Sequence, residues 1–361
     1  MNVIGGKGSC EHACTWACQP LYLQEAIYYS DSASTVSSTI PAFSKRGDLI
    51  IMDEACYDAI LTGVELSRST VVTFRHNDMA HLREILTSIR ADDIRKRFDT
   101  RQQRRFIVTE GLFRLVGDLC PLPAILQLKE EFFYRLILDE STSFGVVGRT
   151  GRGVTEHFGV KITDIEIVTV SVDTTLASVG GLCVGSHEIV DHQRLSGAGY
   201  CFSAAAPPFL ASAALVALSR LEEGGETLVE SLQKRSKRAV TALRKVKGFE
   251  VAADRFDPQG VSGTENKYVS PVIHLSVIPS EIRSWEEDEK IVNHAVELCL
   301  QHGVGVSSVK FSSERVKSMR TARLRPSIKI CVSTALTLKE VESAASTIRK
   351  CCETAFSSAI A

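Results

Sequence analysis

Four polar side chains each follow a short apolar run, a position from which side chains of α/β proteins often act on ligands. Three of them are carboxylates, which accept hydrogen bonds or protons, and the fourth is a hydroxyl. Ligands of parallel sheets bind at the carboxyl ends of the strands, so these positions are candidates for one site. Polar residues also follow strands in many proteins without binding anything, and position alone leaves both interpretations open. The four residues are Asp53, Glu110, Asp139 and Thr174.

The segment 173–181 predicts a loop between two strands. It follows the β-branched run 165–171 and ends on a pair of glycines. A strand, a short polar turn and a second strand would place Thr174 beside the side chains that follow the neighbouring strands. We therefore interpret this loop as the part of the chain around which a site is organised.

Short apolar runs alternate with helical patterns through much of the chain. Residues 79–89 carry apolar side chains at helix spacing, and Pro121 opens a helix that runs to about residue 133. This alternation predicts an α/β protein with a mainly parallel sheet covered by helices on both faces. Strands are expected at 49–52, 71–74, 106–108, 136–138, 165–170 and 182–184.

Two further regions have patterns of their own. Residues 1–20 show no periodicity and are expected to be poorly ordered, whereas residues 21–43 have a helical composition. Residues 207–247 predict two long helices, separated at the glycine pair 224–225.

After Gly248 the pattern predicts a smaller α+β unit. We expect a large domain over residues 21–225, and a linking helix with a small C-terminal domain over 226–361. Within the latter, strands are expected at 251–252, 272–275 and 328–332, helices at 287–302 and 338–357, and loops at 254–268 and 307–324.

The composition is that of an ordinary globular protein. Hydrophobic residues make up 44% and charged residues 24%, and the net charge of -1 gives no general attraction to nucleic acid. A basic run within 95–105 could attract phosphate, but nearby aspartates favour a solvated loop. The most apolar stretch, 202–218, contains two prolines and is too short for a membrane span, so no transmembrane segment is expected.

The eleven cysteines are scattered and odd in number, which indicates free thiols in a reducing compartment. Cys10, Cys14 and Cys18, with His12 among them, form a candidate metal site. Their spacing of four fits no common zinc motif, so free thiols are the favoured interpretation and no metal is predicted.

Several motifs occur in order through the middle of the chain, at residues 74–78, 109–113, 117–122, 139–145 and 148–153. Together they resemble the α-oxoamine synthases, enzymes of fold type I that use pyridoxal phosphate (PLP) to condense an amino acid with an acyl-CoA. The resemblance covers roughly residues 36–357. It implies a PLP-transferase-like large domain, truncated at its N-terminal side, and a smaller C-terminal α+β domain.

Longer segments are similar to the first long-chain-base subunits of the serine palmitoyltransferases. They lie at residues 41–48, 151–159, 191–197, 199–204 and 326–329. This resemblance implies condensation of L-serine with palmitoyl-CoA to 3-ketosphinganine, in sphingolipid biosynthesis. It also implies a place at the cytosolic face of the endoplasmic reticulum membrane. The membrane-anchoring helix usual at the N-terminus of the family is not visible, so we expect an incomplete chain or a form without the anchor.

The resemblance further implies a PLP pocket in which most of the expected groups are replaced. Asp139 occupies the position of the carboxylate that contacts the pyridine nitrogen, and Thr174 that of the lysine that holds the aldehyde. Tyr57 and Thr142 stand where the family has histidines, and Arg114 where it has a serine. The resulting vestigial pocket is expected to comprise Tyr57, Glu110, Asp139, Thr142, Ser171 and Thr174.

The missing lysine decides the interpretation, because a threonine hydroxyl cannot form an imine with an aldehyde. Lys161 precedes the strand and is expected to face away from the pocket. Lys329 stands where catalytic members carry an arginine that binds the substrate carboxylate. A lysine cannot bind a carboxylate through two parallel N–H groups, as the planar guanidinium of arginine does.

We therefore predict a non-catalytic subunit. It would form a heterodimer with a homologous, lysine-bearing catalytic subunit that holds the PLP, and would help to wall the shared site for L-serine and palmitoyl-CoA. One alternative is a scaffold or regulatory pseudoenzyme with no part in catalysis. Another is a self-sufficient PLP enzyme of different specificity, against which Thr174 counts heavily.

Overall fold

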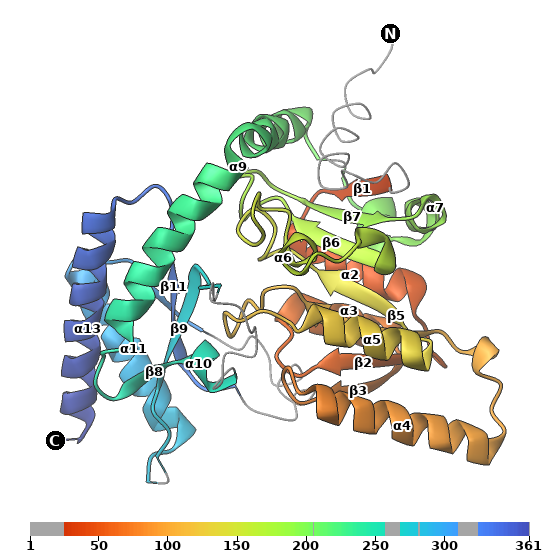
Figure 1. Ribbon diagram of the computed structural model, residues 1–361, viewed down its shortest axis with the longest axis horizontal. Coiled ribbons are helices and arrows are strands. Elements are labelled where there is room, and N and C mark those ends of the chain that lie inside the picture. Colours follow the sequence, from red (N-terminus) through yellow and green to blue (C-terminus); the bar gives the residue numbers. More distant parts are fainter. Residues whose placement is uncertain (1–24, 205, 257–267, 281, 310–323, 361) are drawn as a thin grey trace. The chain divides into compact units, whose positions relative to one another are not determined.

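A computed structural model describes residues 25–204, 206–256, 268–280, 282–309 and 324–360. These residues form two compact units, each built on its own sheet (Figure 1). Among the described residues, one unit takes in 25–113 and 119–229, and the other 114–118, 230–309 and 324–360. The predicted poorly ordered segment 1–20 lies outside the described residues.

The first unit is built on a seven-stranded sheet with the order β1-β7-β6-β5-β4-β2-β3. Strands β3, β2, β4, β5 and β6 run parallel, whereas β7 is antiparallel to both of its neighbours. The predicted α/β class with a mainly parallel sheet is thus confirmed. The strands are β1 (Glu25–Tyr29), β2 (Leu49–Asp53), β3 (Thr70–Phe74), β4 (Arg105–Glu110), β5 (Arg135–Asp139), β6 (Ile167–Ser171) and β7 (Gly181–Gly185).

Helices cover both faces of this sheet, which is why its central strands are apolar on both sides. Every residue of β2 and of β6 is buried. Helices α2 and α3 pack together, as do α4 and α5, and right-handed crossovers place the two pairs on opposite faces (Figure 1). The helices are α2 (Ser32–Phe43), α3 (Asp58–Ser67), α4 (Met79–Lys96), α5 (Leu122–Phe132), α6 (Val154–Phe158), α7 (His187–Ser196) and α8 (Ala198–Cys201). Two short 3-10 turns are η1 (Thr100–Gln102) and η2 (Ile162–Asp164).

The strand order reverses between β2 and β4. From β2 the chain continues to β3 on one side and then returns to β4 on the other. Such a reversal opens a crevice at the carboxyl ends of the two strands, which is where ligands of open α/β sheets bind. In this chain those ends carry Asp53 and Glu110.

The second unit is built on a four-stranded antiparallel sheet with the order β10-β11-β9-β8. Its core includes Ile273, Leu275, Val292, Ile328 and Cys352, all nearly or fully buried. The elements are β8 (Phe249–Val251), α10 (Ala252–Phe256), β9 (Val272–Val277), α11 (Trp285–Gln301), β10 (Ser307–Ser308), β11 (Ser327–Cys331) and α13 (Leu338–Ile360).

The prediction of a helical segment over 21–43 is wrong in its first part. Residues 25–29 form β1, which pairs with β7 from Glu25 opposite Gly185 to Tyr29 opposite Gly181. The helix α2 begins only at Ser32, where the Asp31 side chain accepts a hydrogen bond from the Ser34 N–H. A partner strand some 155 residues away decides the conformation of β1, and no local pattern could show it.

The predicted break at Gly224 and Gly225 is also wrong, because α9 (Pro208–Leu243) is one helix of 36 residues. A Cβ atom at Gly225 would lie 2.4 Å from the Thr150 carbonyl oxygen. Glycine therefore lets the loop at Thr150 approach the helix, which offsets the cost of about 1 kcal/mol for a glycine in a helix interior. Helix α10 and strand β10 likewise occupy the first residues of two stretches predicted as loops, 254–268 and 307–324, most of which lie outside the described residues.

Candidate functional site

The polar residues that follow the strands meet at one edge of the seven-stranded sheet. Asp53, Glu110, Asp139 and Ser171 are the last residues of β2, β4, β5 and β6, and Glu110 lies directly opposite Asp139 in the ladder. All four are at most 2% exposed. Thr174 lies in the loop after β6 and is exposed.

Asp139 is a buried carboxylate with one atom still able to accept a hydrogen bond. Its Oδ1 accepts hydrogen bonds from the hydroxyls of Ser141 and Thr169, each at 2.7 Å. Its Oδ2 has no hydrogen bond of normal geometry to the described part of the chain. Burial raises the pKa of Asp139, while the two hydroxyls and the nearby Tyr57 side chain act in the opposite direction.

Tyr57 joins two of the predicted pocket residues. It is the N-cap residue of α3, and its backbone N–H donates to Glu110 Oε1 at 2.8 Å. The ring is only 8% exposed, and it lies close enough to Asp139 to stabilise the ionised carboxylate. Tyr57, Glu110 and Asp139 therefore form one buried cluster at the strand ends.

The loop after β6 is fastened to the loop after β5 by two threonines. The Thr174 hydroxyl donates to the Ser141 carbonyl oxygen at 2.9 Å, and the Thr175 hydroxyl donates to that of Phe144 at 2.7 Å. The Ser171 hydroxyl donates to Asp173, whose other oxygen accepts a bond of 2.7 Å from Ser32. These hydroxyls shape the loop.

The structure does not gather every predicted residue into this cluster. Thr142 is half-buried in the turn after β5. Arg114 belongs to the second unit, where its carbonyl oxygen accepts a hydrogen bond from His274 Nε2 at 3.1 Å. Lys329 lies in β11 opposite His274, whose pKa falls to about 3, mainly through burial and further through Lys329. Lys161 precedes η2 and β6, at the sheet edge opposite Asp139.

Glu140 is an organising residue that the sequence interpretation missed. It is 4% exposed, and its two oxygens accept hydrogen bonds from the Val154 N–H at 3.1 and 3.2 Å and one from the Ser143 hydroxyl. It thereby ties the start of α6 to the end of β5. The second acidic residue of the pair at 139–140, followed by a glycine-rich stretch at 148–153, was the available signal.

Burial raises the pKa of Glu140 to about 7, against the opposing effect of its hydrogen bonds. In the unfolded chain the Glu140 carboxyl loses its proton near its ordinary pKa of 4.5. In the folded chain it keeps the proton until the pH reaches about 7. Since the folded state then binds more protons, stability is greatest below pH 4.5 and falls as the pH rises to about 7.

We expect Glu140→Gln to remove this part of the pH dependence, which amounts to about 3 kcal/mol across the interval. Urea denaturation of both proteins across that interval measures it. The exposed Glu84 on α4 offers the matched control, and Glu84→Gln should leave the slope unchanged. A smaller slope of the same sign will remain because Asp139 is shifted in the same direction. Equal slopes in the wild-type chain and Glu140→Gln would contradict the assignment.

Two further properties of the chain bear on its chemistry. Within the described ranges, no helix is both long enough and apolar enough to cross a bilayer. The same residues contain no group of three or more His, Cys, Asp or Glu side chains placed to hold a metal ion. The cysteine trio considered from the sequence, Cys10, Cys14 and Cys18, lies outside the described residues.

A family model for aminotransferase class I and II matches residues 19–348 of this chain. The chain belongs to that family. Its seven-stranded sheet, with the candidate site at the carboxyl ends of the parallel strands, is the large-domain sheet of an aminotransferase of fold type I.

Curated relatives of this aminotransferase-family chain carry related names. "Long chain base biosynthesis protein 1b" of Oryza sativa subsp. japonica is 46% identical over 235 residues, which cover 65% of this chain and 48% of the rice protein. "Serine palmitoyltransferase 1" of Dictyostelium discoideum is 37% identical over 330 residues, covering 91% of this chain and 65% of that protein. The chain thus spans about half to two thirds of the length of these relatives.

Solved structures share the fold. A serine palmitoyltransferase variant from S. paucimobilis, described with a bound PLP–myriocin aldimine, superposes with a TM-score of 0.78 at 20% identity. The match covers 97% of this chain and 77% of that one. A serine palmitoyltransferase from Sphingomonas wittichii gives a TM-score of 0.76 at 22% identity. These likenesses establish that this member of the aminotransferase family shares the fold of those enzymes.

The side chains at the strand ends do not fit a PLP held covalently by this chain. Asp139 retains a carboxylate oxygen that could accept a hydrogen bond from a protonated ring nitrogen. Thr174, however, supplies a hydroxyl, which forms no imine, and this hydroxyl already donates to the Ser141 carbonyl oxygen. Tyr57 and Asp139 are moreover almost completely buried by the chain itself.

Proposed function

We propose that this chain is the non-catalytic subunit of a serine palmitoyltransferase. In this proposal it acts with a homologous, lysine-bearing catalytic subunit that holds the PLP. The complex condenses L-serine with palmitoyl-CoA to 3-ketosphinganine. The names of the curated relatives support the reaction, and the family's PLP-dependent fold supports the cofactor.

The observation that carries the subunit assignment is Thr174. It occupies the loop between β6 and β7, where the resemblance to the α-oxoamine synthases expects the lysine. Its hydroxyl is engaged with the loop after β5, and Lys161 precedes β6 at the other end of that strand. A chain with this arrangement has to take its covalent cofactor chemistry from another chain.

In the proposed complex, this chain contributes structure to the site. The bonds from Thr174 and Thr175 hold its loop against the loop after β5, and Glu110 fixes the start of α3 through the Tyr57 N–H. Because these hydrogen bonds hold the loops in one conformation, the loops can form one side of the partner's active site. Placement at the cytosolic face of the endoplasmic reticulum membrane is part of the same proposal, by resemblance to the family.

The first test uses the purified chain incubated with PLP. We expect no visible absorbance of a lysine-bound PLP, and borohydride treatment should fix no PLP on a lysine near Asp139. A lysine-bearing relative treated in the same way serves as the positive control. A stoichiometric chromophore, with the label mapped to a lysine beside Asp139, would show that the subunit assignment is wrong.

Co-expression with the homologous lysine-bearing chain separates the subunit from a scaffold. A subunit of the enzyme should raise the condensation of serine with palmitoyl-CoA well above that of the lysine-bearing chain alone. If the two chains bind each other but the rate is unchanged, the scaffold or regulatory pseudoenzyme is the correct interpretation.

A further inference from the structure

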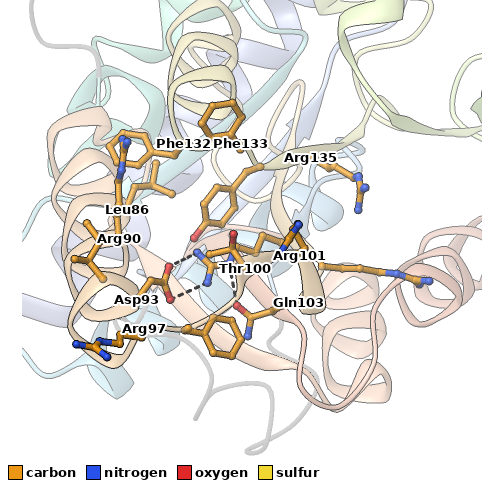
Figure 2. A pocket seen from close by; sticks show the side chains of 15 residues that line it. Leu86, Arg90, Asp93, Arg97, Thr100, Arg101, Gln103, Phe132, Phe133 and Arg135 are labelled. Carbon is orange, nitrogen blue, oxygen red and sulfur yellow. Dashed lines mark hydrogen bonds and ion pairs between the residues drawn. The ribbon is translucent and has the colours of Figure 1, made fainter.

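An arginine-rich cavity lies at the opposite edge of the seven-stranded sheet from the candidate site. It is enclosed by the C-terminal half of α4, the segment after it, the end of α5 and the first residues of β4 and β5. Its volume is about 900 Å³, at the upper end of the range for small-molecule sites (Figure 2). We call it the arginine pocket.

The lining of the arginine pocket is strongly positive. Six arginines and one carboxylate, Asp93, line it, and Asp99, which is not part of the lining, forms an ion pair with Arg101 at 3.0 Å, so four positive charges are left uncompensated. The C-terminal ends of α4 and α5 also lie here, and each contributes a partial negative charge of about one half. Together these ends offset only about one of the four charges, so the cavity still attracts anions. The arginines are Arg90, Arg97, Arg101, Arg104, Arg105 and Arg135.

The only carboxylate of the lining is already neutralised. Arg105 binds Asp93 through both guanidinium ends, at 2.6 and 2.9 Å, and its side chain is 9% exposed. The same guanidinium lies 5.9 Å from the ring centroids of Phe98 and Tyr134. This partly buried pair is fixed in place, and the pocket's spare charge belongs to Arg90, Arg97, Arg104 and Arg135.

Two arginines remain available for a ligand. Arg97 and Arg135 are exposed, and neither side chain has a hydrogen bond or ion pair with the residues that the structure describes. They lie on opposite sides of the pocket in Figure 2. A guanidinium presents a planar fork of N–H groups that matches the oxygens of a phosphate.

Aromatic rings supply the other half of the site. Arg90 lies 5.8 Å over the ring of Phe132, and the next residue, Phe133, is 86% exposed. Phe133 also has a φ of 59°, a left-handed conformation that is costly for a bulky side chain. An exposed ring that lines the same pocket as unpaired guanidinium groups suits a ligand that carries both a flat ring and phosphates.

We propose that the arginine pocket binds a nucleoside polyphosphate, with the phosphates on Arg97 and Arg135 and the base on Phe133. A bilayer with anionic lipids would also be attracted by arginines and an exposed phenylalanine. Although Arg97, Arg135 and Phe133 are exposed, all three line one hollow of ligand size, which favours a discrete ligand over a bilayer.

The test measures binding of N-methylanthraniloyl-ATP to the purified full chain by fluorescence anisotropy. Unlabelled ATP should displace the probe, ADP and AMP progressively less well, and adenosine hardly at all. Arg97→Asn combined with Arg135→Gln should weaken binding at least roughly tenfold, because two charge-assisted contacts are lost. Asparagine at position 97 suits the left-handed backbone there, where φ is 51°.

Two further variants test the aromatic half and the specificity of the charge. Phe133→Asn, which also tolerates the left-handed backbone, should weaken ATP binding but leave competition by inorganic tripolyphosphate unchanged. Arg95→Gln removes an exposed arginine of α4 that does not line the pocket, and it should change binding less than about twofold. Unchanged melting temperatures would show that the variants remain folded.

Several results would overturn the proposal. One is that ATP and tripolyphosphate bind equally well and Phe133→Asn has no effect. A second is that Arg95→Gln and the double variant lose the same amount of affinity for the probe. A third is that the probe does not bind at all. Flotation with phosphatidylserine vesicles, without binding of the soluble nucleotide, would identify the cavity as part of a membrane surface instead.

Discussion

Replacing Asp53 with alanine is expected to lower the free energy of unfolding by about 4 kcal/mol. Asp53 Oδ1 accepts hydrogen bonds from His76 Nδ1 at 2.9 Å and from the Ala55 N–H at 2.8 Å, and Oδ2 accepts one from the Asn77 N–H at 2.9 Å. The Asp53 and His76 side chains are each 1% exposed. Alanine would leave these donors without their acceptor in a buried place, where water cannot replace it.

Urea denaturation measures this loss, and Asp78→Ala is the matched control. Asp78 also accepts a backbone hydrogen bond, from the His81 N–H at 2.9 Å, but it is a partly exposed N-cap beside an exposed arginine. Its replacement should cost only about 1 kcal/mol. If the two alanine variants lose the same stability, the burial of Asp53 and His76 is not what stabilises this end of β2.

Alanine at Gly145 is expected to cost roughly 3 kcal/mol and to displace the loop that carries Thr174. Gly145 has a φ of +80°, which disfavours any Cβ atom. An added Cβ would also lie 2.0 Å from Thr175 Cγ2. Thr175 cannot turn away without losing its hydrogen bond to the Phe144 carbonyl oxygen. The strain should therefore move the whole loop.

Gly159 offers a control that separates the cost of the positive φ from the cost of the clash with Thr175. Gly159 has a φ of +65° with nothing within 4 Å of an added Cβ, so Gly159→Ala should show the backbone cost alone, about 1 kcal/mol. Combining Gly145→Ala with Thr175→Ala removes the nearest methyl group and should recover part of the difference in thermal stability. Equal costs at Gly145 and Gly159 would contradict the steric argument.

The sheet was predictable from local sequence because its strands are buried on both faces. Runs such as 49–52, 106–108 and 136–138 are apolar without alternation, and only a covered parallel sheet accommodates several of them in series. Strand β1 was missed because its conformation depends on β7, far along the chain. The continuity of α9 was missed because the contact that explains Gly225 comes from Thr150.

The candidate site was predictable only in part. The strand ends located Glu110 and Asp139, whereas the significance of Thr174 came from resemblance to a family. The bond between Tyr57 and Glu110, and the pairing of His76 with Asp53, join segments more than twenty residues apart that no spacing rule connects. The basic run 95–105 lines a cavity together with the aromatic residues 132–134, which follow some thirty residues later, so sequence spacing could not connect the two segments.

Strand β4 connects the two edges of the sheet described above. Arg105, at its start, belongs to the arginine pocket, and Glu110, at its end, holds the N–H of Tyr57. Six residues in extended conformation separate these ends by about 17 Å. Substitutions further apart than roughly 10 Å usually have additive effects on stability. Substitutions at one end of β4 are therefore expected to leave the stability contributed by the other end unchanged, so that the two ends of a single strand can be altered independently.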